Sequence, residues 1–141
     1  MAEIIKLKGG RLSLDELNSI FTTIPQEFDV LDENDVVVWS SMNKHRLFQR
    51  TKDSFGKTVF QVHPDKSQNH VKAVLKQMHD GQRNSISINI YKDNKPVNVS
   101  FYSLHDTNGK YLGCVEVTQP ISNYQIKGSK WRNIMNFLRK K

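Results

Sequence analysis

The sequence predicts an α+β fold in which a five-stranded antiparallel sheet carries helices on one face, with further helices at the N- and C-terminal ends. Two observations predict the sheet. Residues 85–118 form three alternating apolar and polar segments separated by turn residues, which indicates three successive strands. Residues 28–39 show strand-like apolar segments around the turn 32–35 and predict an earlier hairpin. A sheet of this kind has one apolar face, which the segment between the two sets of strands has to cover.

Length and composition indicate one globular domain. The chain has 141 residues, of which 37% are hydrophobic and 25% are charged, as in ordinary soluble proteins. Its single cysteine, Cys114, excludes an internal disulfide and a cysteine-based zinc site, and we interpret it as a small buried hydrophobic residue. We see no signal peptide and no apolar run long enough to span a membrane, so we expect a cytoplasmic protein.

The first helix is predicted from its capping residues. Ser13 is followed three residues later by Glu16, which is a capping box, and an apolar helical stripe follows. Pro25 ends this helix, which we place at 13–23. Residues 1–12 precede it as an N-terminal arm, for which we expect either a mobile segment or an edge strand.

The first hairpin and the helical middle follow. We expect a strand near 28–31 and a returning strand at 36–39 that is buried on both faces. A short helix is expected at 42–48. The longest helix is placed at 67–80, with Gly81 as a left-handed cap. Its apolar stripe has helical spacing and consists of Val71, Val74, Leu75 and Met78.

The three later strands are separated by clear turns. Residues 93–96 supply turn chemistry between the first two strands. The Asn-Gly pair in 107–110 is suited to positive φ and predicts the second hairpin turn. The third strand then runs over 111–118.

At 13–120 the chain resembles a PAS domain. The matching stretches are FDVLDENDVVVWSS, FGKTVFQVHPDK and HDTNGKYLGCVEVTQPI. The chain is similar in more detail to the PAS domain that accompanies haemerythrin-type domains in bacterial proteins of unknown function. That similarity rests on LNxIFxxxP, KHRxFxR and HPxKS segments, here beginning at Leu17, Lys44 and His63. The chain departs at TQPI, where PAS strands more often end in Asp-Ile-Thr. The resemblance implies a sensory, ligand-binding or protein-interaction module in signalling.

Catalytic motifs are not recognisable in the sequence. No pair among the five histidines has the spacing of a His-Glu-x-x-His metal site. No glycine-rich phosphate loop and no nucleophile motif occurs. We therefore predict a protein that is not an enzyme and that holds no metal site of these kinds.

The candidate ligand site lies in the helical middle. A basic cluster near aromatic residues suits the rim of a pocket for an anionic small molecule between the helices and the sheet. The alternative is a solvated basic face. A protein partner is the other ligand class that we expect there. The predicted ligand-binding residues are His63, His45, Arg46, Trp39 and Phe55.

A haem-binding sensor is the first alternative function. Some PAS domains resemble haem sensors in which a histidine on the long helix faces the sheet and ligates iron. His70 is the first candidate for this ligand and His63 is the second. The alternative for His70 is a partly exposed residue at the border of the apolar stripe, and the alternative for His63 is a hydrogen bond to a loop carbonyl.

The C-terminal segment, 121–141, is predicted to be a basic amphipathic helix. It holds six lysines and arginines and no acidic residue, so the rest of the chain is nearly neutral. Its apolar stripe contains Trp131, Ile134 and Leu138, which we predict to bind a partner. We expect this helix, or the N-terminal one, to form a homodimer contact. A basic adaptor that contacts nucleic acid or an anionic membrane is a further alternative, and we favour it less.

Overall fold

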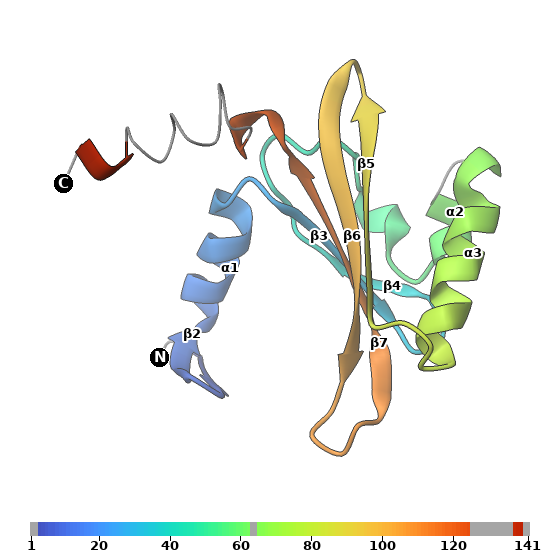
Figure 1. Cartoon of the computed structure of the whole chain (residues 1–141). Helices are drawn as coiled ribbons and strands as arrows, with labels where there is room; N and C mark the ends of the chain where they lie inside the picture. Colours follow the sequence, from blue (N-terminus) through green and yellow to red (C-terminus); the bar gives the residue numbers. More distant parts are fainter. Residues whose placement is uncertain (1–2, 63–64, 125–136, 140–141) are drawn as a thin grey trace.

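The computed structural model describes residues 3–62, 65–124 and 137–139 (Figure 1). The helices are α1 (Leu14–Thr23), α2 (Val59–Val62) and α3 (Asp65–His79), with short 3-10 turns η1 (Lys52–Ser54) and η2 (Ser122–Tyr124). The strands are β1 (Ile4–Leu7), β2 (Gly10–Ser13), β3 (Glu27–Asp32), β4 (Val37–Ser40), β5 (Ser85–Lys92), β6 (Lys95–His105) and β7 (Tyr111–Pro120). None of the described helices is long and apolar enough to cross a membrane.

The central sheet has five strands in the order β4-β3-β7-β6-β5, and every neighbouring pair is antiparallel. The predicted α+β fold is therefore confirmed. The β5–β6 turn consists of Asp93 and Asn94, which both have positive φ, as a two-residue turn requires. The β6–β7 turn is closed by a hydrogen bond from the Asp106 N–H to the Lys110 carbonyl, with Gly109 at positive φ.

Helices α2 and α3 cover one face of the sheet, here called the inner face (Figure 1). The predicted stripe of α3 is confirmed, since all four of its residues are buried. The helix begins at Asp65, two residues before the predicted start. Gly81 has a φ of +73° and donates its N–H to the Met78 carbonyl, which is the expected left-handed cap. The buried core consists of Leu31, Val37, Val59, Val71, Val74, Leu75, Met78, Val97, Val99, Phe101 and Cys114.

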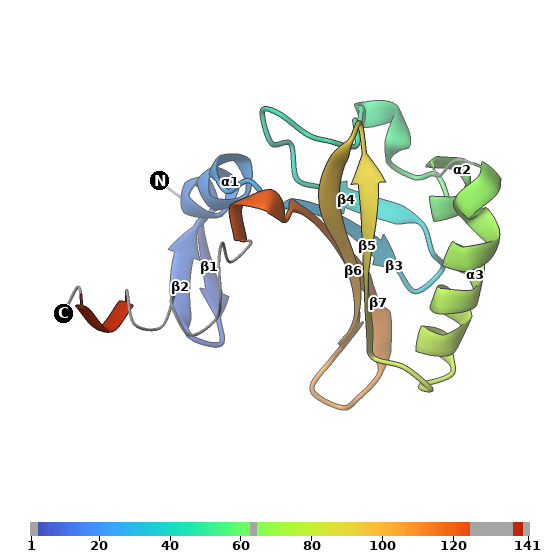
Figure 2. The same cartoon turned by 45° about the horizontal axis from the view of Figure 1, so that its top comes forward.

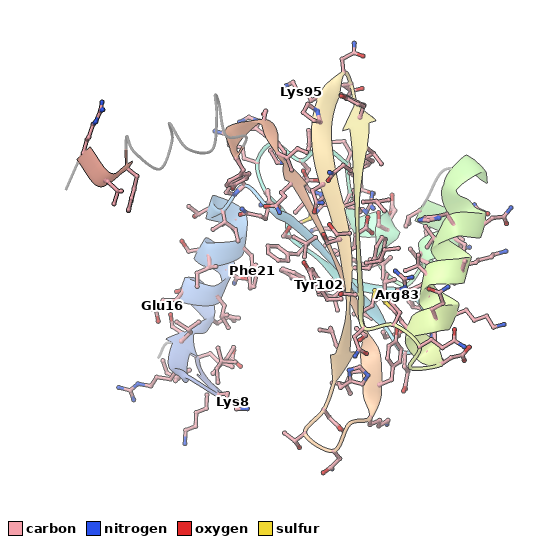
Figure 3. All side chains as sticks on the ribbon, viewed as in Figure 1. Lys8, Glu16, Phe21, Arg83, Lys95 and Tyr102 are labelled. Atoms are coloured by element: carbon pink, nitrogen blue, oxygen red, sulfur yellow. The ribbon has the colours of Figure 1, made fainter. Side chains whose placement is uncertain are left out.

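Helix α1 lies on the opposite side of the sheet from α3 (Figure 2). The capping box is confirmed: Ser13 Oγ accepts the Glu16 N–H, and Glu16 Oε1 accepts the Ser13 N–H. None of its residues is buried. Its main contact with the sheet is Phe21, whose ring meets those of Phe28 and Trp39 edge to face (Figure 3).

The described part of the N-terminal arm does not join the main sheet as an edge strand. Strands β1 and β2 form a separate two-stranded hairpin. The turn at Lys8 and Gly9 lies between two apolar segments, and this was the signal for the hairpin. A hydrogen bond from the Leu14 N–H to the Glu3 carbonyl, at 2.8 Å, joins the hairpin to α1.

Two other expectations are wrong. Strand β4 is not buried on both faces, because it forms an edge of the sheet, and Val38 is 51% exposed. Residues 42–48 form turns rather than a helix. Part of the predicted C-terminal helix, including Trp131 and Ile134, lies outside the described residues. Leu138 is exposed in a short helical segment.

Candidate functional site

The inner face of β3 carries two buried carboxylates. Glu27, Asp29 and Leu31 follow one another at intervals of two residues along the strand. Their side chains therefore point to the same side of the sheet, under the helical layer. Glu116 lies opposite Asp29 in the register of β3 and β7, and it is also buried. Buried charges are costly unless they are paired and hydrogen-bonded. The acidic groups therefore require cations in the same layer.

Arg46 supplies the main positive charge and is itself only 3% exposed. Its Nη2 donates to both oxygens of Asp29, at 2.9 and 3.2 Å, and its Nε lies 3.8 Å from Glu27. The remaining donors reach backbone carbonyls, with Nη1 2.7 Å from that of Ser41 and Nε 2.8 Å from that of Phe48. Because each guanidinium nitrogen is engaged, Arg46 anchors the segment 41–50 to the sheet and is not free to hold a ligand.

The same contacts explain why residues 42–48 are not helical. Glu27 accepts the backbone N–H groups of Leu47 and Phe48, at 2.7 and 3.1 Å. Ser41 Oγ accepts the Phe28 N–H. The buried Glu27 of β3 thus satisfies backbone N–H groups that a helix would otherwise pair within itself.

Arg50 is the second cation of this cluster. Its side chain is 9% exposed, and its Nε lies 3.4 Å from Asp29 Oδ1. That nitrogen is buried and makes no hydrogen bond. Its Nη1 donates to the Gln49 carbonyl. Arg50 therefore completes the neutralisation of Asp29, while one donor remains unused.

A pocket of about 260 Å³ opens beside this cluster. It lies where the end of α1, the start of β3, the segment 43–47 and the end of β7 meet. Its lining residues are Thr22, Thr23, Ile24, Pro25, Glu27, Asn43, Lys44, His45, Leu47 and Pro120. Lys44 and His45 are exposed, and the lysine brings positive charge to the pocket. The carboxylate of Glu27 is already held by Arg46 and by two backbone N–H groups, so the lining favours an anion.

Asn43 connects the pocket to the end of α1. Its Nδ2 donates to the carbonyls of Ile24 and Gln26, at 2.5 and 2.9 Å. Its Oδ1 accepts the hydroxyl of Ser41, whose carbonyl binds Arg46. A continuous set of hydrogen bonds therefore runs from the buried cluster to the residue that caps α1.

The structure brings together only some of the predicted ligand residues. His45 lines the pocket, and Arg46 lies behind it. Trp39 packs on Phe21 at a ring distance of 4.9 Å, on the other side of the sheet. Phe55 is exposed and does not line this pocket. His63 lies outside the described residues.

Of the two haem ligands expected from the sequence, only His70 belongs to the residues that the structure describes. His70 is exposed on α3, whereas its neighbour Val71 is buried. An exposed imidazole does not face the sheet, as an axial ligand inside the domain would. The position agrees with the alternative interpretation, a polar residue beside the core.

Cys114 lies on the inner face and is buried. Burial first, and then the nearby charges of Glu116 and Asp35, raise the pKa of its thiol to about 12. The thiol is therefore protonated at neutral pH, which agrees with a small hydrophobic role.

Sequence reasoning missed the buried acids. The signal was present in the segment EFDVLD, where acidic residues alternate with apolar ones in a strand. We used the apolar residues only to place a strand near 28–31 and did not consider which face the acids occupy. An arginine in the adjacent KHR segment was the cue that Glu27 and Asp29 could be buried as ion pairs.

Comparisons with known proteins agree with this architecture. A C-terminal domain from Streptococcus mutans has a TM-score of 0.79 and 24% identity, over 87% of this chain and 96% of that one. A PAS domain from Colwellia psychrerythraea has a TM-score of 0.59 and 13% identity, over 78% and 98%. VqmA of Vibrio cholerae, in a complex with ligand and DNA, has a TM-score of 0.60 and 21% identity. The similarity covers 79% of this chain and 52% of VqmA.

The search of curated proteins gave no match. The sequence model of a family described as "PAS domain" matches residues 17–122. This match extends from within α1 to just beyond β7 and includes the whole central sheet. The chain belongs to the PAS domain family.

Proposed function

We propose that this PAS domain is a non-catalytic sensory module of the cytoplasm that binds a small anionic ligand in the pocket beside the buried cluster. The observation that carries this proposal is which charged residues of the pocket lining already have partners. Lys44 and His45 in its lining are exposed, and Lys44 is positively charged, whereas the carboxylate of Glu27 is already held by its own partners. An anion that enters would therefore meet uncompensated positive charge.

The similar solved structures support a signalling role. They include the sensor region of a sensor histidine kinase, a sensory box sensor histidine kinase from Vibrio cholerae, and a VqmA structure with ligand and DNA. The place of the pocket supports the same role. A ligand there would contact both the end of α1 and Pro120, which ends β7, so it would bridge the two ends of the domain. Helix α1 has no buried residue, so small changes at its end could alter its position.

Anion binding can be tested by thermal unfolding. Phosphate, acetate and succinate would be titrated against the purified protein, with chloride at matched ionic strength as the reference. An anion at one hundred times its Kd stabilises the folded state by about 2.7 kcal/mol. We expect at least one of the three anions to raise Tm above the chloride reference.

The double variant Lys44→Gln/His45→Gln should lose this shift. The matched control is His70→Gln/Lys110→Gln, which removes the same two residue types at exposed positions outside the pocket lining. The control should keep the full shift. Equal shifts in both variants would show that the anions act elsewhere, and no shift in the unmodified protein would contradict an anion of this class.

A further inference from the structure

The two edges of the central sheet are treated differently. The free edge of β4 is covered by its own chain: the Val37 N–H donates to the Lys57 carbonyl at 2.9 Å, and the Gly56 N–H donates to the Val37 carbonyl at 3.0 Å. At the other edge, β5 pairs with β6 and with no other strand that the structure describes. Figure 1 shows β5 at the margin of the sheet.

The backbone groups that face this open edge can be identified from the β5–β6 pairing. In antiparallel pairs, alternate residues exchange both hydrogen bonds with the neighbouring strand. The Ser103 N–H donates to the Asn84 carbonyl, which places even-numbered residues of β5 in bonded pairs. Tyr91 lies opposite Pro96, which has no N–H to donate. The odd-numbered residues of β5 are therefore in the non-hydrogen-bonded pairs. Their N–H and C=O groups point away from β6; these residues are Ser85, Ser87, Asn89 and Tyr91.

Over residues 85–91, strand β5 has none of the features that normally protect an edge, and its one charged residue is Lys92 at the end. Such edges usually carry charged residues, proline or a bulge, which prevent pairing with another chain. Residues 85–91 contain no charge and no proline, and the pairing with β6 has no register shift. On the inner face, Ile86, Ile88 and Ile90 are only partly buried against the core. An additional strand would cover the rest of these three side chains.

We propose that β5 pairs antiparallel with β5 of a second copy of the chain, with Ile88 opposite Ile88 on the two-fold axis. Opposite residues must share a face of the sheet, so even-numbered residues meet even-numbered ones. This register places Ile86 opposite Ile90 on the inner face. On the outer face it places Ser87 opposite Asn89 and Ser85 opposite Tyr91.

Lys92 disfavours registers that are shifted towards the C-terminal end of β5, and a shift of the axis to Ser87 would put Ile90 opposite Asn84. Lys92 shares the inner face with the isoleucines, because its Nζ lies over the ring of inner-layer Phe48. Moving the axis to Asn89 would put Lys92 opposite Ile86, and moving it to Ile90 would put Lys92 opposite Ile88. The axis at Ile88 leaves Lys92 beyond the apolar pairs. Two five-stranded sheets then become one continuous sheet, with both helical layers on the same side.

Cysteine cross-linking tests the register. In the Ile88→Cys variant, two cysteines face each other in a non-hydrogen-bonded pair with Cα atoms about 4.5 Å apart, which suits a disulfide. We expect mild oxidation to convert it to a covalent dimer. Ile90→Cys is the matched control, because Cys at 90 is about 13 Å from its copy in this register. Unmodified protein is a second control, since its Cys114 is buried.

Disruption of the edge gives an independent measurement. Tyr91→Pro removes an outward N–H while leaving the bonds to β6, and the Tyr91 side chain is exposed. We expect sedimentation to show a dimer for the unmodified protein and for Tyr91→Phe, and at least tenfold weaker association for Tyr91→Pro with unchanged circular dichroism. Three results would each overturn the proposal: a monomer at high micromolar concentration, equal cross-linking of the two cysteine variants, or an unweakened Tyr91→Pro dimer. A dimer that persists in Tyr91→Pro would place the contact elsewhere, such as the terminal helices.

Discussion

Replacing Arg46 with methionine should destabilise the fold strongly. The change keeps an unbranched side chain but removes the charge and the donors that reach Asp29, Ser41 and Phe48. Two buried carboxylates, those of Asp29 and Glu27, then lose their closest cation. Removal of one partner from a buried ion pair costs about 3–5 kcal/mol, because the remaining charge stays buried. Since a domain of this size has about 5–15 kcal/mol of stability, this variant should lose a large part of it.

Urea denaturation at pH 7 measures the loss, with Arg83→Met as control because Arg83 is exposed. The control should change the free energy of unfolding by less than about 0.5 kcal/mol. The double variant Glu27→Gln/Arg46→Met should be more stable than Arg46→Met alone, because Glu27 is then neutral and Asp29 keeps Arg50 as its partner. The reasoning would be refuted if Arg46→Met cost less than about 1 kcal/mol, or if the double variant were less stable than the single one.

Three further predictions follow from other parts of the structure. Gly113 has a φ of +135°, and a Cβ there would overlap the Leu31 carbonyl, so Gly113→Ala should lower Tm far more than Gly109→Ala, whose turn position is open. The raised thiol pKa of Cys114 means that the folded state holds its proton more tightly, so stability should fall as pH rises from about 9 towards about 12, and Cys114→Val should reduce that fall in urea titrations. Haemin titration of the unmodified protein and of His70→Ala should give the same absorption spectra, because the imidazole is exposed; a Soret band lost in the variant would restore His70 as a ligand.

Much of the fold could be predicted because its signals are local. The apolar and polar alternation of β5, β6 and β7 follows from a sheet with one buried face. The stripe of α3 and the capping box at Ser13 depend on residues within one or two turns of helix. The hairpin turns contain residues that tolerate positive φ, namely Asp93, Asn94 and Gly109.

The candidate site was harder to predict because its parts come from distant segments. Arg46 looked like a rim residue in an exposed basic run. Its actual role depends on Glu27 and Asp29, which lie buried on the inner face of a strand, although acidic side chains are usually exposed to solvent. Trp39 was grouped with the pocket by sequence proximity, although the pleat of β4 turns it to the opposite face, against Phe21. Only the paired strands reveal which face each residue occupies.

The location of β3 between β4 and β7 has consequences for the order of folding. β5, β6 and β7 are joined by short turns and can form early at a low entropic cost. β3 must then pair with β7 across a long loop, with Glu27 opposite Thr118. This step removes two carboxylates from water, and it is favourable only when Arg46 arrives with them. We therefore expect the transition state to contain the β5–β7 meander, and substitutions around Arg46 to speed unfolding more than they slow folding.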